Sequence, residues 1–254
     1  MRVKLDLTGR IALVTGGSGD LGRVISRTLA SCGAQVVVHY HSRAAEAEKV
    51  VADIIAAGGK AWACSADLGD EAATIKLAAN IRTHVGDPHI VVANAVVQYQ
   101  PWASVLEQPL TDFDSQYRSC VRQAVLLAKA FAPAMQRAKG GRFIGLSTEC
   151  AAQCRPGQSA YVSGKRGMDA VLKVLANELG PDGITVNQVA PGWMLSDRNR
   201  DDAPVDWYIN EIPLRRRGHD QDVANAIAFL ASDLASYITG TWLPVAGGHV
   251  MPTF

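Results

Sequence analysis

Short apolar runs rich in β-branched residues recur along this chain of 254 residues, and segments of helical periodicity separate them. Such runs are typical of strands buried on both faces, and the segments between them are typical of amphipathic helices. We predict seven strands, in runs 11–15, 36–40, 61–64, 90–93, 143–147, 184–189 and 241–245. Between the first two runs, apolar residues from Leu21 to Leu29 trace one helical face. The alternation predicts an α/β fold, with a doubly wound, seven-stranded parallel sheet in a single domain over residues 1–254.

Composition and charge narrow the class of protein. Apolar residues make up 48% of the chain, no apolar run approaches the length needed to span a bilayer, and residues 1–6 lack a secretory signal. The net charge is +1, and residues 215–217 form the only notable basic block, so we predict neither nucleic-acid nor membrane binding. The five cysteines are scattered, which predicts a reducing, cytoplasmic location and no metal site.

A glycine-rich loop follows the first predicted strand and leads into a helix, with the sequence Thr-Gly-Gly-Ser-Gly-Asp-Leu-Gly over residues 15–22. Glycines allow the backbone to approach a pyrophosphate, whose charge the helix N-terminus stabilises. Because strand, loop and helix occur in this order, we interpret the loop as nucleotide-binding rather than as a simple turn. With the alternating pattern, it predicts a Rossmann fold.

Tyr161 and Lys165 are four residues apart on a predicted helix, and Thr148 lies thirteen residues before Tyr161. Residues at this helical spacing share one face. An ammonium beside a phenol favours phenolate, so we expect the pKa of Tyr161 to fall toward the working range. The Thr148 hydroxyl would orient a carbonyl oxygen for proton transfer.

These motifs together resemble the short-chain dehydrogenase/reductase family, and the resemblance covers nearly the whole chain. Gly16 and Gly22 open and close the family's glycine fingerprint, and Tyr161 and Lys165 match its catalytic pair. Residues 212–218, 222–224 and 246–248 resemble the C-terminal half of bacterial 3-oxoacyl-carrier-protein reductases and of related sugar and alcohol dehydrogenases.

The resemblance implies an oxidoreductase that interconverts a ketone and a secondary alcohol by hydride transfer. Tyr161 would transfer the proton, Lys165 would lower its pKa and bind the nicotinamide ribose, and Thr148 would bind the carbonyl oxygen, with Ser147 as the less favoured substitute. The positions implied for cofactor binding are Gly16, Ser18, Gly19, Leu21, Gly22, Asp67, Leu68, Asn94, Ala95, Tyr161, Lys165, Pro191, Gly192 and Ser196.

The end of the second predicted strand indicates which nicotinamide cofactor is used. An enzyme that prefers NAD usually has a carboxylate there, whereas residues 39–43 read His-Tyr-His-Ser-Arg. Ser42 can donate to a 2′-phosphate and Arg43 can pair with it, so we predict NADP(H). The alternative is that Arg43 only begins a solvated helix.

Four positions depart from the family pattern: Asp20, Val96, Cys120 and Ala246. Asp20 would repel a pyrophosphate unless it points away, although aspartate is also a favoured helix N-cap. Cys120 stands where the family has an asparagine whose carbonyl holds a water that links the lysine to solvent. These departures support an alternative hypothesis, in which the protein binds a nucleotide or a partner with little or no catalysis.

Segments 97–102, 150–155 and 193–214 are predicted to surround a small-molecule substrate. Their large side chains either line the pocket, which would favour an apolar or flat substrate, or form a core under a lid; they are Tyr99, Trp102, Met194, Trp207, Tyr208 and Ile209. Arg155 could meet an anionic group of the substrate, and residues 215–217 could meet an acidic carrier protein, but we expect both to be solvated. Relatives assemble through the helices near positions 120 and 165 and through the last strand, so we predict a homo-oligomer, a tetramer or dimer, with residues 249–254 packed on a neighbour.

Overall fold

A parallel sheet of seven strands forms the centre of the computed structural model, which describes residues 5–196 and 205–251. The strands lie in the order β3-β2-β1-β4-β5-β6-β7, and every pairing is parallel. Their bounds are Ile11–Val14 (β1), Gln35–Tyr40 (β2), Lys60–Ser65 (β3), Ile90–Ala93 (β4), Gly141–Leu146 (β5), Ile184–Pro191 (β6) and Trp242–Val245 (β7). The predicted doubly wound sheet is confirmed, and the strand order reverses between β1 and β4.

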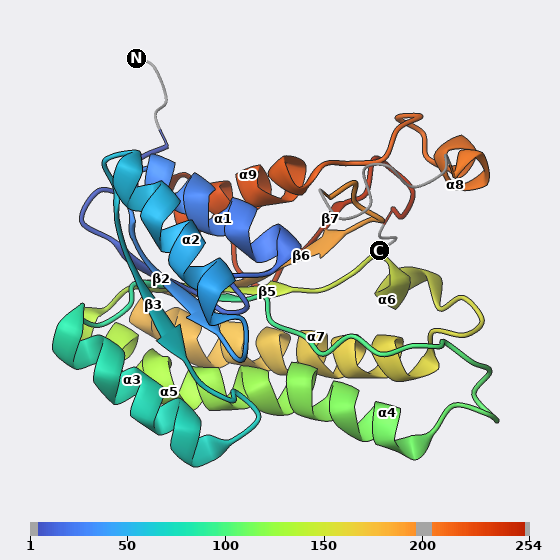
Figure 1. The fold of residues 1–254 in the computed structure, drawn as a ribbon, viewed down its shortest axis with the longest axis horizontal. Coiled ribbons are helices and arrows are strands. Elements are labelled where there is room, and N and C mark those ends of the chain that lie inside the picture. The colour runs from blue at the N-terminus through green and yellow to red at the C-terminus, as the bar shows by residue number, and fades with distance from the viewer. Residues whose placement is uncertain (1–4, 197–204, 252–254) are drawn as a thin grey trace.

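Helices cover both faces of the sheet (Figure 1). One layer contains α1 (Asp20–Ser31), α2 (Ala44–Ala56) and α9 (Asp220–Ala231). The opposite layer contains α3 (Glu71–His84), α4 (Leu110–Gln116), the π-helical turn η1 (Tyr117–Arg122), α5 (Gln123–Ala138) and α7 (Ser159–Leu179). Each layer closes a separate apolar cluster against the sheet, so β1, β4 and β5 are buried on both faces.

The short elements gather beyond the carboxyl ends of the central strands. There α6 (Cys150–Gln153) and α8 (Asp206–Glu211) lie at one end of the molecule (Figure 1). The remaining elements are the 3₁₀ turns η2 (Gly180–Asp182) and η3 (Asp233–Ala235). No helix in the part of the chain that the structure describes is both long and apolar enough to cross a membrane.

Candidate active site

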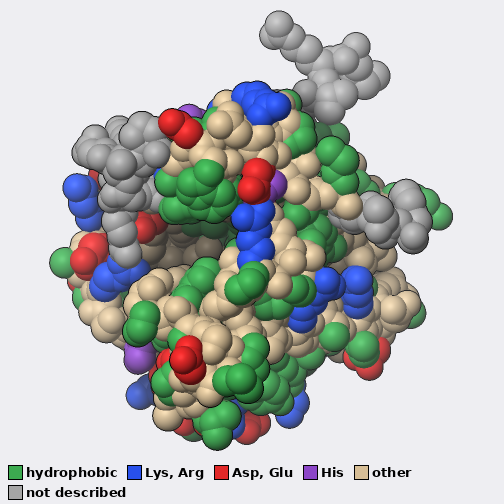
Figure 2. All heavy atoms as spheres, turned by 90° about the vertical axis from the view of Figure 1, so that its right-hand side faces the viewer, with side chains coloured by type: hydrophobic (Ala, Val, Ile, Leu, Met, Phe, Trp, Pro, Cys, Tyr) green, Lys and Arg blue, Asp and Glu red, His purple; other side chains and the backbone are tan. Residues whose placement is uncertain are grey.

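One continuous cleft of about 430 Å³ lies along the carboxyl ends of the strands. It contains all three candidate catalytic residues and every predicted cofactor position except Asp67 and Leu68. Those two line an adjoining cavity, which shares His39 and His41 with the cleft. The face at this end of the molecule is hollowed, and hydrophobic side chains border the hollow (Figure 2). Segments that are far apart in the sequence are therefore brought to one site.

The glycine loop forms one wall of the cleft, and its glycines are required by close packing. A Cβ atom on Gly22 would lie 2.1 Å from the carbonyl oxygen of Gly16, and Gly16 itself has a φ of +60°. The Gly16 N–H donates to Nδ1 of His39 at 3.2 Å, which fixes the loop to the end of β2. Burial lowers the pKa of His39 to about 4, so this imidazole is neutral and can accept that hydrogen bond at neutral pH.

Asp20 is the first residue of α1, whose N-cap is Gly19, so the interpretation of Asp20 as the N-cap is wrong by one position. Asp20 also borders the cleft. Its carboxylate lies 3.9 Å from the Arg23 guanidinium, one turn along α1, and this ion pair offsets its negative charge. An aspartate in this loop is therefore compatible with an anion at the helix N-terminus.

Ser42 and Arg43 line the same cleft at the end of β2. A Cβ on Gly19 would lie 3.5 Å from a terminal nitrogen of Arg43, so the guanidinium extends over the glycine loop. Among the described residues, no carboxylate forms an ion pair with Arg43. The arginine precedes α2, as the alternative interpretation required, but it is also placed where it can contact a bound phosphate.

Asn94 and Ala95 connect the glycine loop to the end of β4. The Asn94 side-chain amide donates to the carbonyl oxygen of Thr15 at 2.8 Å, and the backbone N–H groups of both residues donate to the Thr15 hydroxyl at 2.9 Å. Val96, where the family has a glycine, follows them on the wall of the cleft. These bonds hold the ends of β1 and β4 together at the point where the strand order reverses.

Tyr161, Lys165 and Thr148 meet at the centre of the cleft. Lys165 is almost fully buried; its Nζ donates to the carbonyl oxygen of Leu146 at 2.5 Å and lies 5.9 Å from the centre of the Tyr161 ring. The Ser147 hydroxyl donates to Asp169 at 3.0 Å and accepts from Trp242 at 2.9 Å, so it is engaged away from the phenol. This arrangement favours Thr148 over Ser147 as the hydroxyl beside Tyr161.

Burial dominates the electrostatics of Tyr161. Desolvation raises the pKa of its phenol, while the charge of Lys165 and a hydrogen bond with Thr148 act to lower it. The expectation that Lys165 brings this pKa down overall is therefore wrong for this arrangement, because the burial of the phenol has the larger effect. The ring is covered by Trp102, whose own ring stacks on it at 5.9 Å, and the Tyr161 backbone N–H donates to the Tyr99 hydroxyl at 3.0 Å.

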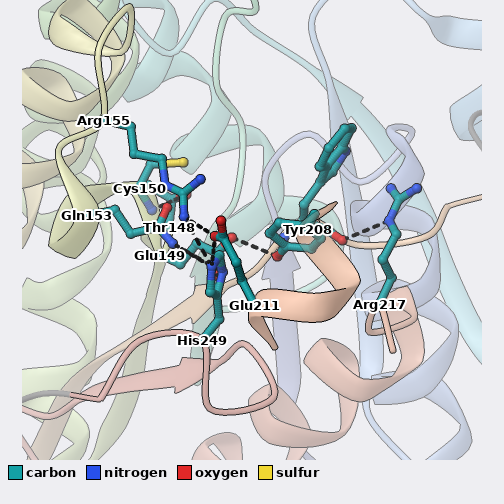
Figure 3. Close-up of polar contacts among 10 residues, drawn as sticks. Thr148, Glu149, Cys150, Gln153, Arg155, Tyr208, Glu211, Arg217 and His249 are labelled. Atoms are coloured by element: carbon teal, nitrogen blue, oxygen red, sulfur yellow. Dashed lines mark hydrogen bonds and ion pairs between the residues drawn. The ribbon is translucent and has the colours of Figure 1, made fainter. Parts of the chain in front are cut away.

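A polar network, buried at Glu149, Tyr208 and His249, holds α8 and residue 249 against the site (Figure 3). Glu149, next to Thr148, accepts a hydrogen bond from the Tyr208 hydroxyl at 2.7 Å and lies 3.0 Å from Nδ1 of His249. Nε2 of His249 lies 3.1 Å from Glu211, which also pairs with Arg155. Burial and the adjacent Glu149 carboxylate raise the pKa of Tyr208. The sequence did not indicate this network.

The expectation of solvated arginines is wrong for Arg155 and Arg217, whereas Arg215 and Arg216 are exposed as expected. Arg155 is not simply solvated, because it pairs with Glu211 and lies 5.7 Å from the ring centre of Trp207. Arg217 is buried; it stacks 4.7 Å from the ring centre of Trp193 and donates to the carbonyl oxygen of Met194 at 2.6 Å. Both guanidiniums thus hold the segments around the cleft in place. Of the predicted segment 193–214, residues 197–204 lie outside the described part of the chain.

The large side chains of the predicted substrate segments have divided roles. Tyr208 is buried and belongs to the polar network, whereas Met194 lines the cleft. Trp102, Trp193 and Trp207 remain 39–55% exposed around the site. The His249 side chain is buried against its own chain rather than on a neighbour, and residues 252–254 of the predicted packing tail lie outside the described residues.

Comparisons with known proteins agree with this architecture. Residues 18–249 match the family described as Enoyl-(Acyl carrier protein) reductase. The chain is 33% identical to the 3-oxoacyl-[acyl-carrier-protein] reductase FabG of Pseudomonas aeruginosa, over 97% of this chain and 100% of the relative. The FabG of Staphylococcus epidermidis is 35% identical, over 94% and 98%. The chain belongs to the short-chain dehydrogenase/reductase family.

Solved structures of this family superpose closely on the chain. The promiscuous reductase LugOII, which catalyses keto-reduction at C1 during lugdunomycin biosynthesis, has a TM-score of 0.89 at 32% identity, covering 96% of this chain and 99% of its own. A doubly substituted mutant of a Serratia marcescens short-chain dehydrogenase/reductase has a TM-score of 0.88 at 34% identity, covering 96% and 98%.

Cys120 is the clearest departure of this short-chain dehydrogenase/reductase from the pattern of its family. It lies in the π-helical turn η1 and is 1% exposed, within the apolar cluster under α5 and α7. Such turns are frequent at functional sites. One turn later, the Gln123 amide donates to the carbonyl oxygens of Ala95 and Ser119, at 2.8 and 2.5 Å. The side-chain amide of Gln123 thus contacts the loop after β4, although the family pattern places its asparagine at the position of Cys120.

Proposed function

We propose that this protein is an NADP(H)-dependent oxidoreductase that interconverts a ketone and a secondary alcohol. The observation that carries the proposal is the placement of Tyr161, Lys165 and Thr148 in the same cleft as the glycine loop and the N-terminus of α1. A dinucleotide fits this cleft, because the close approach of Gly16 and Gly22 leaves room for phosphates beside α1. The nicotinamide, when bound, supplies or accepts the hydride.

Each candidate catalytic residue has a distinct task in the proposed reaction. In reduction, the Tyr161 phenol gives its proton to the carbonyl oxygen, and in oxidation the phenolate takes it back. The Thr148 hydroxyl orients that oxygen, and the Lys165 ammonium favours the phenolate. Because desolvation and Lys165 act on the pKa of Tyr161 in opposite directions, the balance between them sets the pH at which each direction runs.

Ser42 and Arg43 support NADP(H) as the cofactor. A charge-assisted hydrogen bond contributes about 1.5–3 kcal/mol, but Arg43 is exposed, so we take the lower half of that range. In calorimetric titration, Arg43→Ala should weaken the binding of NADPH about tenfold and leave the binding of NADH nearly unchanged. Arg27→Ala, which removes an arginine outside the cleft, is the control. Equal weakening of both cofactors, or a wild-type preference for NADH, would contradict this assignment.

The surroundings of the cleft support an apolar or flat carbonyl substrate. Trp102, Trp193 and Trp207 leave large ring surfaces exposed, and Arg155, Arg216 and Arg217 are already held by protein groups. The relatives differ in the substrates that their names imply. FabG is described as a 3-oxoacyl-carrier-protein reductase, and LugOII is described as a reductase in lugdunomycin biosynthesis. A panel should therefore include both 3-oxoacyl thioesters and aromatic ketones.

A homo-oligomer in the cytoplasm completes the proposal. An apolar depression on the outer face of α5 and α7 includes Val171 and Val174, and Val174 is 54% exposed. A second copy of the chain, packed with the same face, would cover it. This agrees with the prediction that the chain assembles through the helices near positions 120 and 165. Light scattering should give a dimer or tetramer, and a monomeric mass would contradict this part of the proposal.

Turnover with NADPH separates the proposal from its rival, a nucleotide- or partner-binding protein with little or no catalysis. The wild type should oxidise NADPH in the presence of at least one ketone of the panel, and Tyr161→Phe should lose this activity while it still binds NADPH. Tyr237→Phe, at a fully exposed tyrosine, is the matched control and should keep full activity. NADPH binding without turnover on the whole panel would favour the rival.

A further inference from the structure

A buried carboxyl group lies one helical turn after Lys165. Asp169 and Lys165 are 5% and 2% exposed, and their spacing puts them on the same face of α7. Their side chains contact successive residues at the end of β5, because Lys165 donates to the Leu146 carbonyl oxygen and the Ser147 hydroxyl donates to Oδ2 of Asp169. Both groups therefore lie on the side of α7 that faces the end of β5, and among the described residues no direct ion pair joins them.

Two further strands contribute polar side chains around Asp169 and Ser147. Nε1 of Trp242 in β7 donates to the Ser147 hydroxyl at 2.9 Å, and the amide of Gln188 in β6 donates to the backbone carbonyl oxygen of Asp169 at 2.9 Å. Gln188 and Trp242 are paired in register, so both side chains face α7. Residues from three neighbouring strands and one helix thus form a polar cluster, adjacent to the apolar cluster under α7; they are Ser147, Asp169, Gln188 and Trp242.

The hydrogen bonds of this cluster leave both acceptors and donors unused. Oδ1 of Asp169 and Oε1 of Gln188 have no hydrogen-bond partner within the described part of the chain. The Lys165 ammonium has three donors, and the Leu146 carbonyl oxygen takes one of them. A buried ammonium is costly unless an opposite charge compensates it, and the same holds for a buried carboxylate. The Lys165 ammonium and the Asp169 carboxylate can therefore each compensate the buried charge of the other.

We propose that the Asp169 carboxylate is a buried countercharge to the Lys165 ammonium and opposes the action of that ammonium on Tyr161. The proposal rests on the proposed function, in which Tyr161 transfers the proton. Burial raises the pKa of Asp169, and the Ser147 hydroxyl and the charges of Lys165, Arg166 and Lys173 act against that rise. Tyr161 is faced by Lys165 from its own helix, by Cys150 from α6 and by Cys120 from η1.

The effect of this charge on Tyr161 can be estimated from the helix. Asp169 follows Tyr161 by eight residues, which corresponds to a separation of about 12 Å along α7. At an effective dielectric constant of about 20, a unit charge at that distance changes a pKa by about one unit. A negative charge disfavours phenolate, so Asp169→Asn, which removes the charge and keeps the shape, should lower the pKa of Tyr161 by about one unit.

The test reads the ionisation of Tyr161 directly. Protein with carbon-13-labelled tyrosine rings is titrated by NMR, and Tyr161→Phe identifies the resonance. We expect Asp169→Asn to lower the pKa by about one unit, and Asp169→Glu, which keeps the charge, to leave it close to that of the wild type. Gln188→Leu removes a polar partner without changing the charge and should also leave it close to that of the wild type.

Three results would overturn the proposal: an unchanged pKa in Asp169→Asn, a shift of about one unit in Asp169→Glu, or an equal shift in Gln188→Leu. The pH at which alcohol oxidation reaches half its maximum should fall by the same amount in Asp169→Asn as the NMR value. Should the wild type show no turnover, the proposed function fails while the NMR titration still decides the role of Asp169. If Asp169→Asn does not fold, the other two variants keep the proposal open to refutation.

Discussion

Gly22→Ala is the substitution that most directly tests the geometry of the glycine loop. Its new Cβ would lie 2.1 Å from the Gly16 carbonyl oxygen and 2.9 Å from the Gly16 carbonyl carbon and the Gly17 Cα, all of them backbone atoms. Ordinary contacts of this kind are about 3.4 Å or longer, so the loop must move by more than about 1 Å. Overpacking of this kind costs about 1–3 kcal/mol. For a chain of this size, the melting temperature should fall by roughly 2–12 °C.

The same movement should displace the N–H groups beside α1 and weaken NADPH by at least about tenfold, since a misplaced charge-assisted hydrogen bond costs about 1.5 kcal/mol or more. Gly140→Ala is the control, because no atom outside its two chain neighbours lies within 4 Å of its new Cβ and its φ is not in the left-handed region. It should melt at the wild-type temperature or slightly above it. Calorimetry and NADPH titration on both variants suffice. If Gly22→Ala melts and binds like the control, the loop is not packed as described.

Two further predictions concern buried polar positions. The pKa of His39 is about 4 in the folded chain and about 6.5 when unfolded, so the unfolded state binds more protons between these values and stability falls as the pH drops through them. The free energy of unfolding should fall by about 3 kcal/mol between pH 7 and pH 4, as measured by urea unfolding. His39→Gln should lose correspondingly less over the same range, and an equal loss in both proteins would contradict the assignment. Cys120→Asn should keep or raise turnover but unfold more easily by about 1–3 kcal/mol, because it buries an amide in an apolar cluster. A large loss of turnover in a folded Cys120→Asn protein would instead show that the thiol takes part in the reaction.

Local patterns predicted the parts of the fold that depend on neighbouring residues in the chain. All seven strands lie within a few residues of the predicted runs. The central strands are buried on both faces, which needs a continuous apolar segment. The glycine loop was also evident, since backbone packing as close as that of Gly22 on Gly16 excludes other residues. Tyr161 and Lys165 needed only helical spacing to be placed together. Which cofactor and which substrate this cleft accepts stay predictions.

The errors concern charges whose partners are remote in sequence. Arg155 and Arg217 resemble surface residues in the sequence because the side chains that they contact lie far from them along the chain. The structure supplies Glu211 for the first and Trp193 for the second. Glu149 and His249 are a hundred residues apart, and each alone is an ordinary polar residue. Such pairs form only after the strands bring their carboxyl ends together, so spacing arguments cannot find them.

The sign of the Tyr161 shift shows why the site needed the structure as well as the motif. A tyrosine four residues before a lysine on a solvated helix would have its pKa lowered, since the attraction to the ammonium would be the main effect. Trp102 stacks on this ring and shields it from solvent, so desolvation outweighs the same lysine. The motif fixes which groups meet, but burial decides which protonation state each one prefers. A buried carboxylate beside Lys165 then matters more than it would on a surface, because little solvent remains to screen it.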